Sequence, residues 1–90
     1  MTVSAPRDVI TAGIRAKIVE IAAGLGIDAA DFTDDDIIPA TGLLDSAGVL
    51  ELIVWYETEY HVPLKDDEIN IDNLGSINAM TNFLLARRAG

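Results

Sequence analysis

The chain has 90 residues, which suffice for one small domain with a thin core and suit a carrier or binding module better than an enzyme with a deep cleft. Half of the residues are hydrophobic, which argues against disorder, and the absence of cysteine excludes disulfides and thiolate metal sites. Fifteen acidic residues against six basic ones give a net charge of −9, which argues against binding to nucleic acid or anionic lipid.

The acidic residues gather in the middle of the chain. Thirteen of them lie between Asp28 and Asp72, where Lys65 is the one basic residue, so partners that present lysine and arginine are expected. The N-terminus lacks the pattern of a signal peptide, and no apolar run approaches the roughly 18 residues of a membrane span. We therefore expect a cytoplasmic protein without a membrane span.

A first helix is predicted from about Arg7 to Leu25, with Pro6 at or before its start. Its apolar residues recur at steps of three and four, which is one face of a helix: Ile10, Ile14, Ile18, Ile21 and Leu25. Gly26 follows as the residue expected to end this helix.

Residues 26–44 form a long connection without a sustained period, and we expect it to be ordered. Its apolar members are expected to fold back over the core: Phe32, Ile37, Leu43 and Leu44. The acidic run Asp34–Asp36 does not fit a calcium loop, because counting from Asp31 or Asp34 finds neither the required glycine nor the required glutamate. We interpret the run as a solvated acidic loop and expect no metal site.

A second helix is predicted to begin at Asp45–Ser46, where either residue can serve as N-cap, and to end soon after His61, before Pro63. Its expected buried stripe consists of Val49, Leu52, Ile53, Tyr56 and Tyr60, and its opposite face of Leu50, Glu51, Val54, Glu57 and Thr58. No nucleophile and acid lie at a recognisable spacing from His61, so we interpret it as a surface or cap residue rather than a catalytic base.

The last third of the chain predicts a short helical turn within Asp66–Gly75 and a closing helix that Ser76 caps. The expected anchors of the turn are Ile69, Ile71 and Leu74, and the inward residues of the closing helix are Ile77, Met80, Phe83 and Leu84. Arg87 and Arg88 fall in the last turn, where cations favour the helix dipole. Without a convincing strand, the chain predicts a small antiparallel helical bundle, all-α, as a single domain over 1–90 with its core at about 7–88.

The segment Gly42-Leu43-Leu44-Asp45-Ser46-Ala47-Gly48 carries the functional signal. It places Ser46 at the start of an amphipathic helix, directly after a loop. The unpaired N–H groups and partial positive charge of a helix N-terminus would accommodate a phosphate ester on the Ser46 oxygen. The alternative is that Ser46 is only a helix cap.

This segment, followed by an acidic helix studded with apolar residues, resembles the phosphopantetheine attachment site of acyl and peptidyl carrier proteins. The resemblance covers about residues 7–88 and implies a small antiparallel four-helix bundle of acyl-carrier type, with a long loop between helices one and two and a short third helix. It implies 4′-phosphopantetheine on Ser46, transferred from coenzyme A by a phosphopantetheinyl transferase, with Asp45 in a supporting role. It also implies partner docking at four positions: Leu50, Glu51, Val54 and Glu57. Thr58 stands where many relatives carry an acid.

The residues after the serine bear on the cargo. Fatty-acid carriers usually have leucine there, whereas this chain has Ala47 and Gly48, which looks more like D-alanyl and related aminoacyl carrier proteins. Trp55 and Tyr56 are bulkier than their counterparts in fatty-acid carriers and would partly fill an interior that could shelter a long acyl chain.

The resulting prediction is a monomeric carrier, not an enzyme, that holds an acyl or, more in keeping with its motif, an aminoacyl group as a thioester. Its expected partners are the transferase, a loading ligase with a basic docking patch and a downstream acyl-accepting enzyme. The alternative is an acidic helical protein–protein interaction module without covalent modification. Replacement of Ser46 would abolish loading in the first case and leave function nearly intact in the second.

Overall fold

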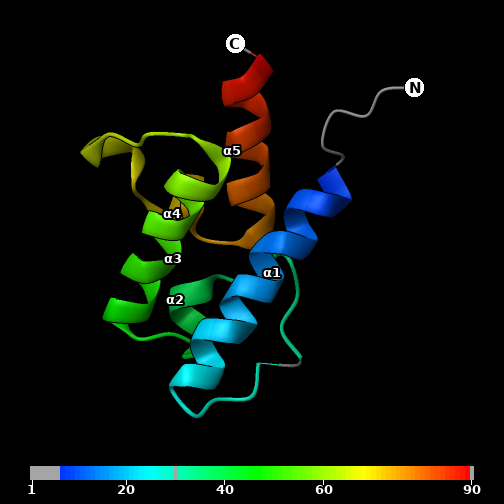
Figure 1. The fold of residues 1–90 in the computed structure, drawn as a ribbon, viewed down its shortest axis with the longest axis vertical. Helices are drawn as coiled ribbons and strands as arrows, with labels where there is room; N and C mark the ends of the chain where they lie inside the picture. Colours follow the sequence, from blue (N-terminus) through cyan, green and yellow to red (C-terminus); the bar gives the residue numbers. More distant parts are fainter. Residues whose placement is uncertain (1–6, 30, 90) are drawn as a thin grey trace.

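The all-helical fold that the sequence predicts is confirmed by a computed structural model, which describes residues 7–29 and 31–89. Those residues form α1 (Arg7–Gly24), α2 (Ile38–Thr41), α3 (Ser46–Tyr60), the 3₁₀ turn η1 (Asp66–Glu68), α4 (Ile71–Leu74) and α5 (Ile77–Ala89), with no strand among them (Figure 1). The sequence predicts helical structure in the regions of α1, α3, α4 and α5, whereas α2 was not expected. Pro6, predicted near the start of the first helix, lies outside the described residues.

The core lies between the three long helices, each of which contributes one apolar stripe. The buried residues of these stripes are Ile10, Ile14, Ile18 and Ile21 of α1, Leu52, Ile53 and Tyr56 of α3, and Ile77, Met80 and Leu84 of α5. Val49, Tyr60 and Phe83 are only half-buried and pack against this core. The spacing of apolar residues therefore predicts most of the interior correctly.

Leu25 is the exception on α1, because 43% of its surface is exposed. The helix ends at Gly24, one residue before Leu25, and Gly26 turns the chain with a φ of 78° that favours glycine. Leu25 therefore leaves the helical face on which its spacing had placed it. The prediction that Leu25 shares the apolar face of this helix is wrong.

Two glycines let α1 and α3 approach closely. A Cβ added to Gly48 would lie 3.2 Å from Cγ2 of Ile21, and one added to Gly13 would lie 2.9 Å from the Tyr60 hydroxyl. The start of α3 thus packs on the second half of α1 and the end of α3 on the first half, so the two helices run in opposite directions (Figure 1).

The start of α3 is fixed by Asp45. Its side chain Oδ1 accepts a hydrogen bond from the Gly48 N–H at 2.7 Å, and its carbonyl accepts one from the Val49 N–H at 2.9 Å. Of the two residues that could cap this helix, Asp45 is therefore the N-cap, and Ser46 is the first helical residue. At the other end His61 adopts a left-handed conformation, with a φ of 53°, two residues before Pro63.

The described part of the long connection, residues 26–29 and 31–44, folds back on the core as predicted, but a different residue anchors it. Phe32 and Leu44 are buried as expected, whereas Ile37 is 39% exposed and its neighbour Ile38 is 2% exposed. The reason is α2: the single turn begins at Ile38, whose N–H donates to the Gly75 carbonyl at 2.7 Å and turns its side chain inward.

The acidic run in this connection takes part in holding the loop. Asp34 pairs with Arg15 at 2.6 Å, and the Asp34 carbonyl accepts a hydrogen bond from the Asn78 N–H at 3.0 Å. Asp35 accepts a hydrogen bond from the Asn78 side chain at 2.6 Å, and Asp36 accepts one from the Thr33 N–H at 2.9 Å. The contacts of Asp34 and Asp35 hold the loop against α1 and α5, whereas the contact of Asp36 lies within the loop. The acidic run is therefore not a purely solvated segment.

The predicted turn in Asp66–Gly75 consists of η1 and α4, and one of its three expected anchors is buried. Leu74 is buried, but Ile69 and Ile71 are 40% and 57% exposed, so their assignment as core anchors is wrong. Each lies near an end of a very short helix, and a single turn can bury only one side of itself. Ser76 caps α5 as predicted, since its Oγ accepts the Ala79 N–H at 3.0 Å.

Tyr56 makes a buried polar contact in the core. Its side chain is fully buried, and its hydroxyl donates a hydrogen bond to the Met80 carbonyl at 2.8 Å, which joins α3 to α5. Burial raises the pKa of Tyr56 far above its usual range, so the hydroxyl stays protonated and remains a donor.

Replacement of Tyr56 by phenylalanine should lower the free energy of unfolding by about 1 kcal/mol, because the Met80 carbonyl loses a buried donor. Urea denaturation measures the change. Tyr60→Phe is the matched control, because the Tyr60 hydroxyl makes no hydrogen bond to the described residues and should be dispensable. Equal stability of the two variants would contradict the role assigned to the Tyr56 hydroxyl.

Asp45→Ala should also cost about 1 kcal/mol of stability, since the helix loses its side-chain cap. Ser46→Ala should change stability by less than about 0.5 kcal/mol, because the Ser46 side chain caps nothing in this structure. Thermal unfolding of both variants checks the difference. A larger loss for Ser46→Ala than for Asp45→Ala would assign the cap to Ser46 instead.

Candidate functional site

Ser46 lies exposed at the first position of α3, where the connection after α2 ends. Within residues 7–29 and 31–89 its hydroxyl has no hydrogen-bond partner, because the capping role belongs to Asp45. The hydroxyl is therefore exposed to solvent and takes part in no hydrogen bond that holds the fold of the described residues.

The local electrostatics suit a phosphate ester at this oxygen. The first N–H groups of a helix have no intrahelical partner. Asp45 accepts a hydrogen bond from the Gly48 N–H, whereas the N–H groups of Ser46 and Ala47 stay without a partner within the helix. These groups and the helix dipole give the N-terminus of α3 a partial positive charge. A phosphate linked to Ser46 would thus be stabilised where it is attached.

A groove leads away from Ser46 between α3 and α4. Its mouth is lined by Ser46, Asp45, Leu44, Val49 and Pro39. Pro39 and Val49 also line a deeper hollow of about 180 Å³, so the two hollows adjoin at these residues. We call them together the α3–α4 groove; its deeper part is further lined by Ile53, Ile69, Asn70, Ile71, Leu74 and Gly75.

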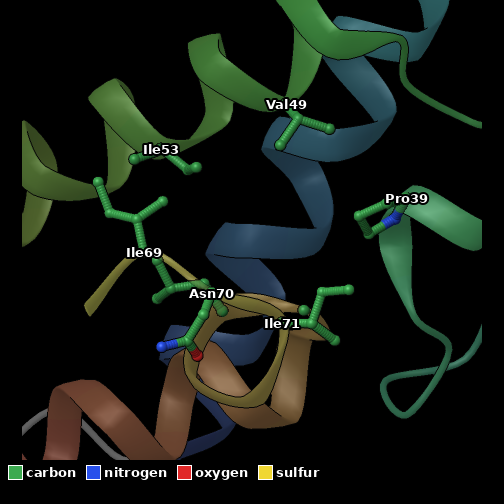
Figure 2. Close-up of a pocket in the computed structure, with 8 residues that line it drawn as sticks. Pro39, Val49, Ile53, Ile69, Asn70 and Ile71 are labelled. Carbon is green, nitrogen blue, oxygen red and sulfur yellow. The ribbon is translucent and has the colours of Figure 1, made fainter. Parts of the chain in front are cut away.

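Figure 2 shows how the deeper part is built from three segments. Val49 and Ile53 face it from α3, Pro39 closes it from α2, and Ile69 and Ile71 face it from the segment around α4. Ile69 and Ile71, which are exposed and do not anchor the core, therefore form part of the wall of this groove. Sequence reasoning missed this groove, although two isoleucines in an otherwise polar segment were its visible signal.

The four predicted docking residues do not all face the same way. Leu50 and Val54 are 62% and 59% exposed and line, with Glu51, a hollow beside α1. Glu57 is half-buried, and its carboxylate accepts a hydrogen bond from the Leu64 N–H at 2.9 Å. Thr58 lines the same hollow as Leu50 and Val54.

The aromatic residues of α3 divide between the interior and the surface. Tyr56 fills the core, whereas Trp55 is half-buried beside α1, with the Lys17 Nζ 6.0 Å from its ring centroid. Trp55 also makes an edge contact with Tyr60 at 5.6 Å between ring centroids. Tyr56 is therefore the aromatic residue that occupies interior space, and Trp55 packs at the edge of the α1–α3 contact.

Two kinds of feature are missing from the part of the chain that the structure describes. It contains no group of three or more histidine, aspartate or glutamate side chains that could hold a metal ion. It also contains no helix whose length and apolar character would allow it to cross a membrane.

Comparison with known proteins identifies a relative of this chain. The chain is 35% identical over 66 residues to a D-alanyl carrier protein of Streptococcus sanguinis (strain SK36), a match that covers 72% of this chain and 82% of the relative. No family model matches the chain. No solved structure matches it either. The similarity to the streptococcal protein extends over most of both sequences, and the chain belongs to the carrier protein family.

Proposed function

We propose that this chain carries a 4′-phosphopantetheine arm on Ser46 and uses it to deliver an aminoacyl or acyl group to partner enzymes. The observation that supports the proposal best is an exposed serine hydroxyl, without a structural task, at the first residue of α3 and at the mouth of an apolar groove. The chain's membership of the carrier protein family supports the same function. The chain itself catalyses no step.

The residues around Ser46 would hold the arm in three ways. Asp45 fixes where α3 begins and so fixes the position of the Ser46 oxygen. The N–H groups at the start of α3 would stabilise the phosphate. Val49 and Pro39 would contact the organic part of the arm and keep water from it. The arm supplies a terminal thiol that holds the cargo as a thioester.

The cargo proposed here is an aminoacyl group. The streptococcal relative is named for D-alanine, and Ala47-Gly48 after the serine resembles aminoacyl carriers more than fatty-acid carriers. Tyr56 supports the same assignment, because its buried ring occupies interior space that a long acyl chain would need.

The proposed partners are a phosphopantetheinyl transferase, a loading ligase with a basic docking patch and a downstream acceptor of the cargo. The net charge of −9 would steer partners with lysine and arginine surfaces and would keep the chain monomeric. Tethering raises the effective concentration of the cargo once the carrier has docked, so docking itself can be weak and brief. We place these encounters in the cytoplasm.

The first test is the intact mass of the protein after incubation with coenzyme A, magnesium and a broad-specificity phosphopantetheinyl transferase. We expect a gain of one phosphopantetheine group, mapped to Ser46 by fragmentation and absent in Ser46→Ala. A folded wild-type protein that gains nothing, beside a control carrier that is modified, would favour the alternative of an acidic interaction module. The exposed Leu50 and Val54 are the observation that keeps this alternative open.

The second test concerns the cargo. The modified protein should accept an amino acid from its adenylating ligase and should not accept long fatty acyl groups, because its Ala47-Gly48 motif resembles that of aminoacyl carriers. Mass spectrometry of the loaded protein measures both reactions under the same conditions. Efficient loading with a long acyl chain by the cognate enzyme would contradict the aminoacyl assignment and leave the carrier function standing.

A further inference from the structure

Glu57 lies at the end of the α3–α4 groove that is far from Ser46. Ile53 of α3 and Ile69 of the facing loop line the groove together at this end (Figure 2). Glu57 follows Ile53 by one helical turn on the same side of α3. Its Oε2 accepts the Leu64 N–H at 2.9 Å, which turns the side chain toward the loop that leads to Ile69. The apolar groove therefore ends beside a carboxylate.

One oxygen of this carboxylate is engaged and the other is not. Among residues 7–29 and 31–89, the Glu57 Oε1 makes no hydrogen bond and the side chain makes no ion pair. The loop that holds Oε2 is itself held, because the Pro63 carbonyl accepts a hydrogen bond from Arg87 of α5 at 3.1 Å. Glu57 is also half-buried, so salt screens its charge less than that of a fully exposed carboxylate. A cation at this end of the groove would meet an oriented acceptor with a free oxygen.

The separation of Ser46 and Glu57 matches the length of the arm. Glu57 follows Ser46 by eleven residues within α3, which corresponds to about 16 Å along the helix axis. The main chain of phosphopantetheine, from phosphorus to sulfur, has about the length of four to five extended residues, or roughly 15 Å. An arm that follows the groove would therefore bring its cargo to the level of Glu57.

The two classes of cargo differ in charge at this point. An aminoacyl group keeps its α-amino group, which is largely protonated at neutral pH, whereas a fatty acyl group is uncharged. An ammonium group is stabilised by a hydrogen bond to a carboxylate oxygen, and partial burial strengthens the interaction. The uncharged group gains nothing from the same carboxylate.

We propose that Glu57 binds the ammonium group of an aminoacyl cargo through its free Oε1, at the far end of the α3–α4 groove. The inference rests on the proposed function of Ser46 and names the residue that recognises the class of its cargo. Val49, Ile53 and Ile69 line the groove between Ser46 and this carboxylate and would contact the arm there. Glu57 then distinguishes an aminoacyl from an acyl cargo by its charge.

The experiment compares two cargoes that differ only in the amino group. Alanyl and propionyl groups are joined to the arm of coenzyme A through an amide instead of a thioester, so that they are not hydrolysed. A broad-specificity transferase then attaches each arm to Ser46. Glu57→Gln removes the charge and keeps an oxygen for the Leu64 N–H. Glu59→Gln is the matched control, because Glu59 is exposed on α3 and does not line the groove.

The Leu64 amide reports on the Glu57 carboxylate, to which it donates, and NMR measures its chemical shift. We expect this shift to differ between the alanyl and propionyl forms of the wild type and of Glu59→Gln, and not to differ in Glu57→Gln. The pKa of the alanyl amino group should be about half a unit higher in the wild type than in Glu57→Gln, or about threefold in proton affinity, because an opposite charge favours the protonated form. Added salt should reduce this difference.

Two results would overturn the proposal and leave the proposed function standing. If both arms are attached to Ser46 and the Leu64 amide has the same shift with either cargo, the ammonium group does not reach Glu57. If the pKa of the amino group is the same in Glu57→Gln and Glu59→Gln, Glu57 does not bind it. Thermal unfolding of both variants shows that the fold is retained. If neither arm is attached to Ser46 of the folded wild-type protein, the proposed function fails and the role of Glu57 fails with it.

Discussion

The contact between α1 and α3 at Gly48 is the constraint on which the rest of the structure depends. The Gly48 N–H donates to Asp45, and a Cβ on Gly48 would lie 3.2 Å from the Asp45 carboxylate and from the Ile21 side chain. The same residue therefore sets where α3 begins and how closely α3 approaches α1. A side chain at this position would require these neighbours to give way by a few tenths of an ångström and would loosen the packing at the start of α3.

The surfaces beside Ser46 follow from this arrangement. On one side α3 faces α2 and α4, and the short helices leave an apolar groove because single turns cannot cover it completely (Figure 2). On the other side α3 meets α1, and the small residues Ala47 and Gly48 leave a hollow. The groove is apolar and begins at Ser46, whereas the hollow between α1 and α3 is lined by the carboxylates of Asp45 and Glu51 and by the ammonium group of Lys17. Ser46 therefore stands between an apolar surface and a charged one.

Much of this fold could be predicted from the sequence, and the failures have a common physical cause. The isoleucines of α1 and the apolar residues of α5 follow a helical period, and local geometry alone places such residues on one face. The residues that were misplaced stand at or beyond helix ends: Leu25, Ile37, Ile69 and Ile71. There the direction of a side chain depends on contacts with distant segments, such as the hydrogen bond from Ile38 to Gly75, and no local period reports them.

The candidate site shows the same division. Ser46 could be predicted as the site residue from the sequence, because the loop, the aspartate, the serine and the amphipathic helix follow one another directly along the chain. The sequence could not predict that Asp45 rather than Ser46 caps the helix, since both residue types cap helices. That choice matters for function. A serine that capped its helix would have its hydroxyl engaged, and modification would then cost stability. With Asp45 as the cap, a substituent on the Ser46 oxygen would displace no hydrogen bond that holds the start of α3.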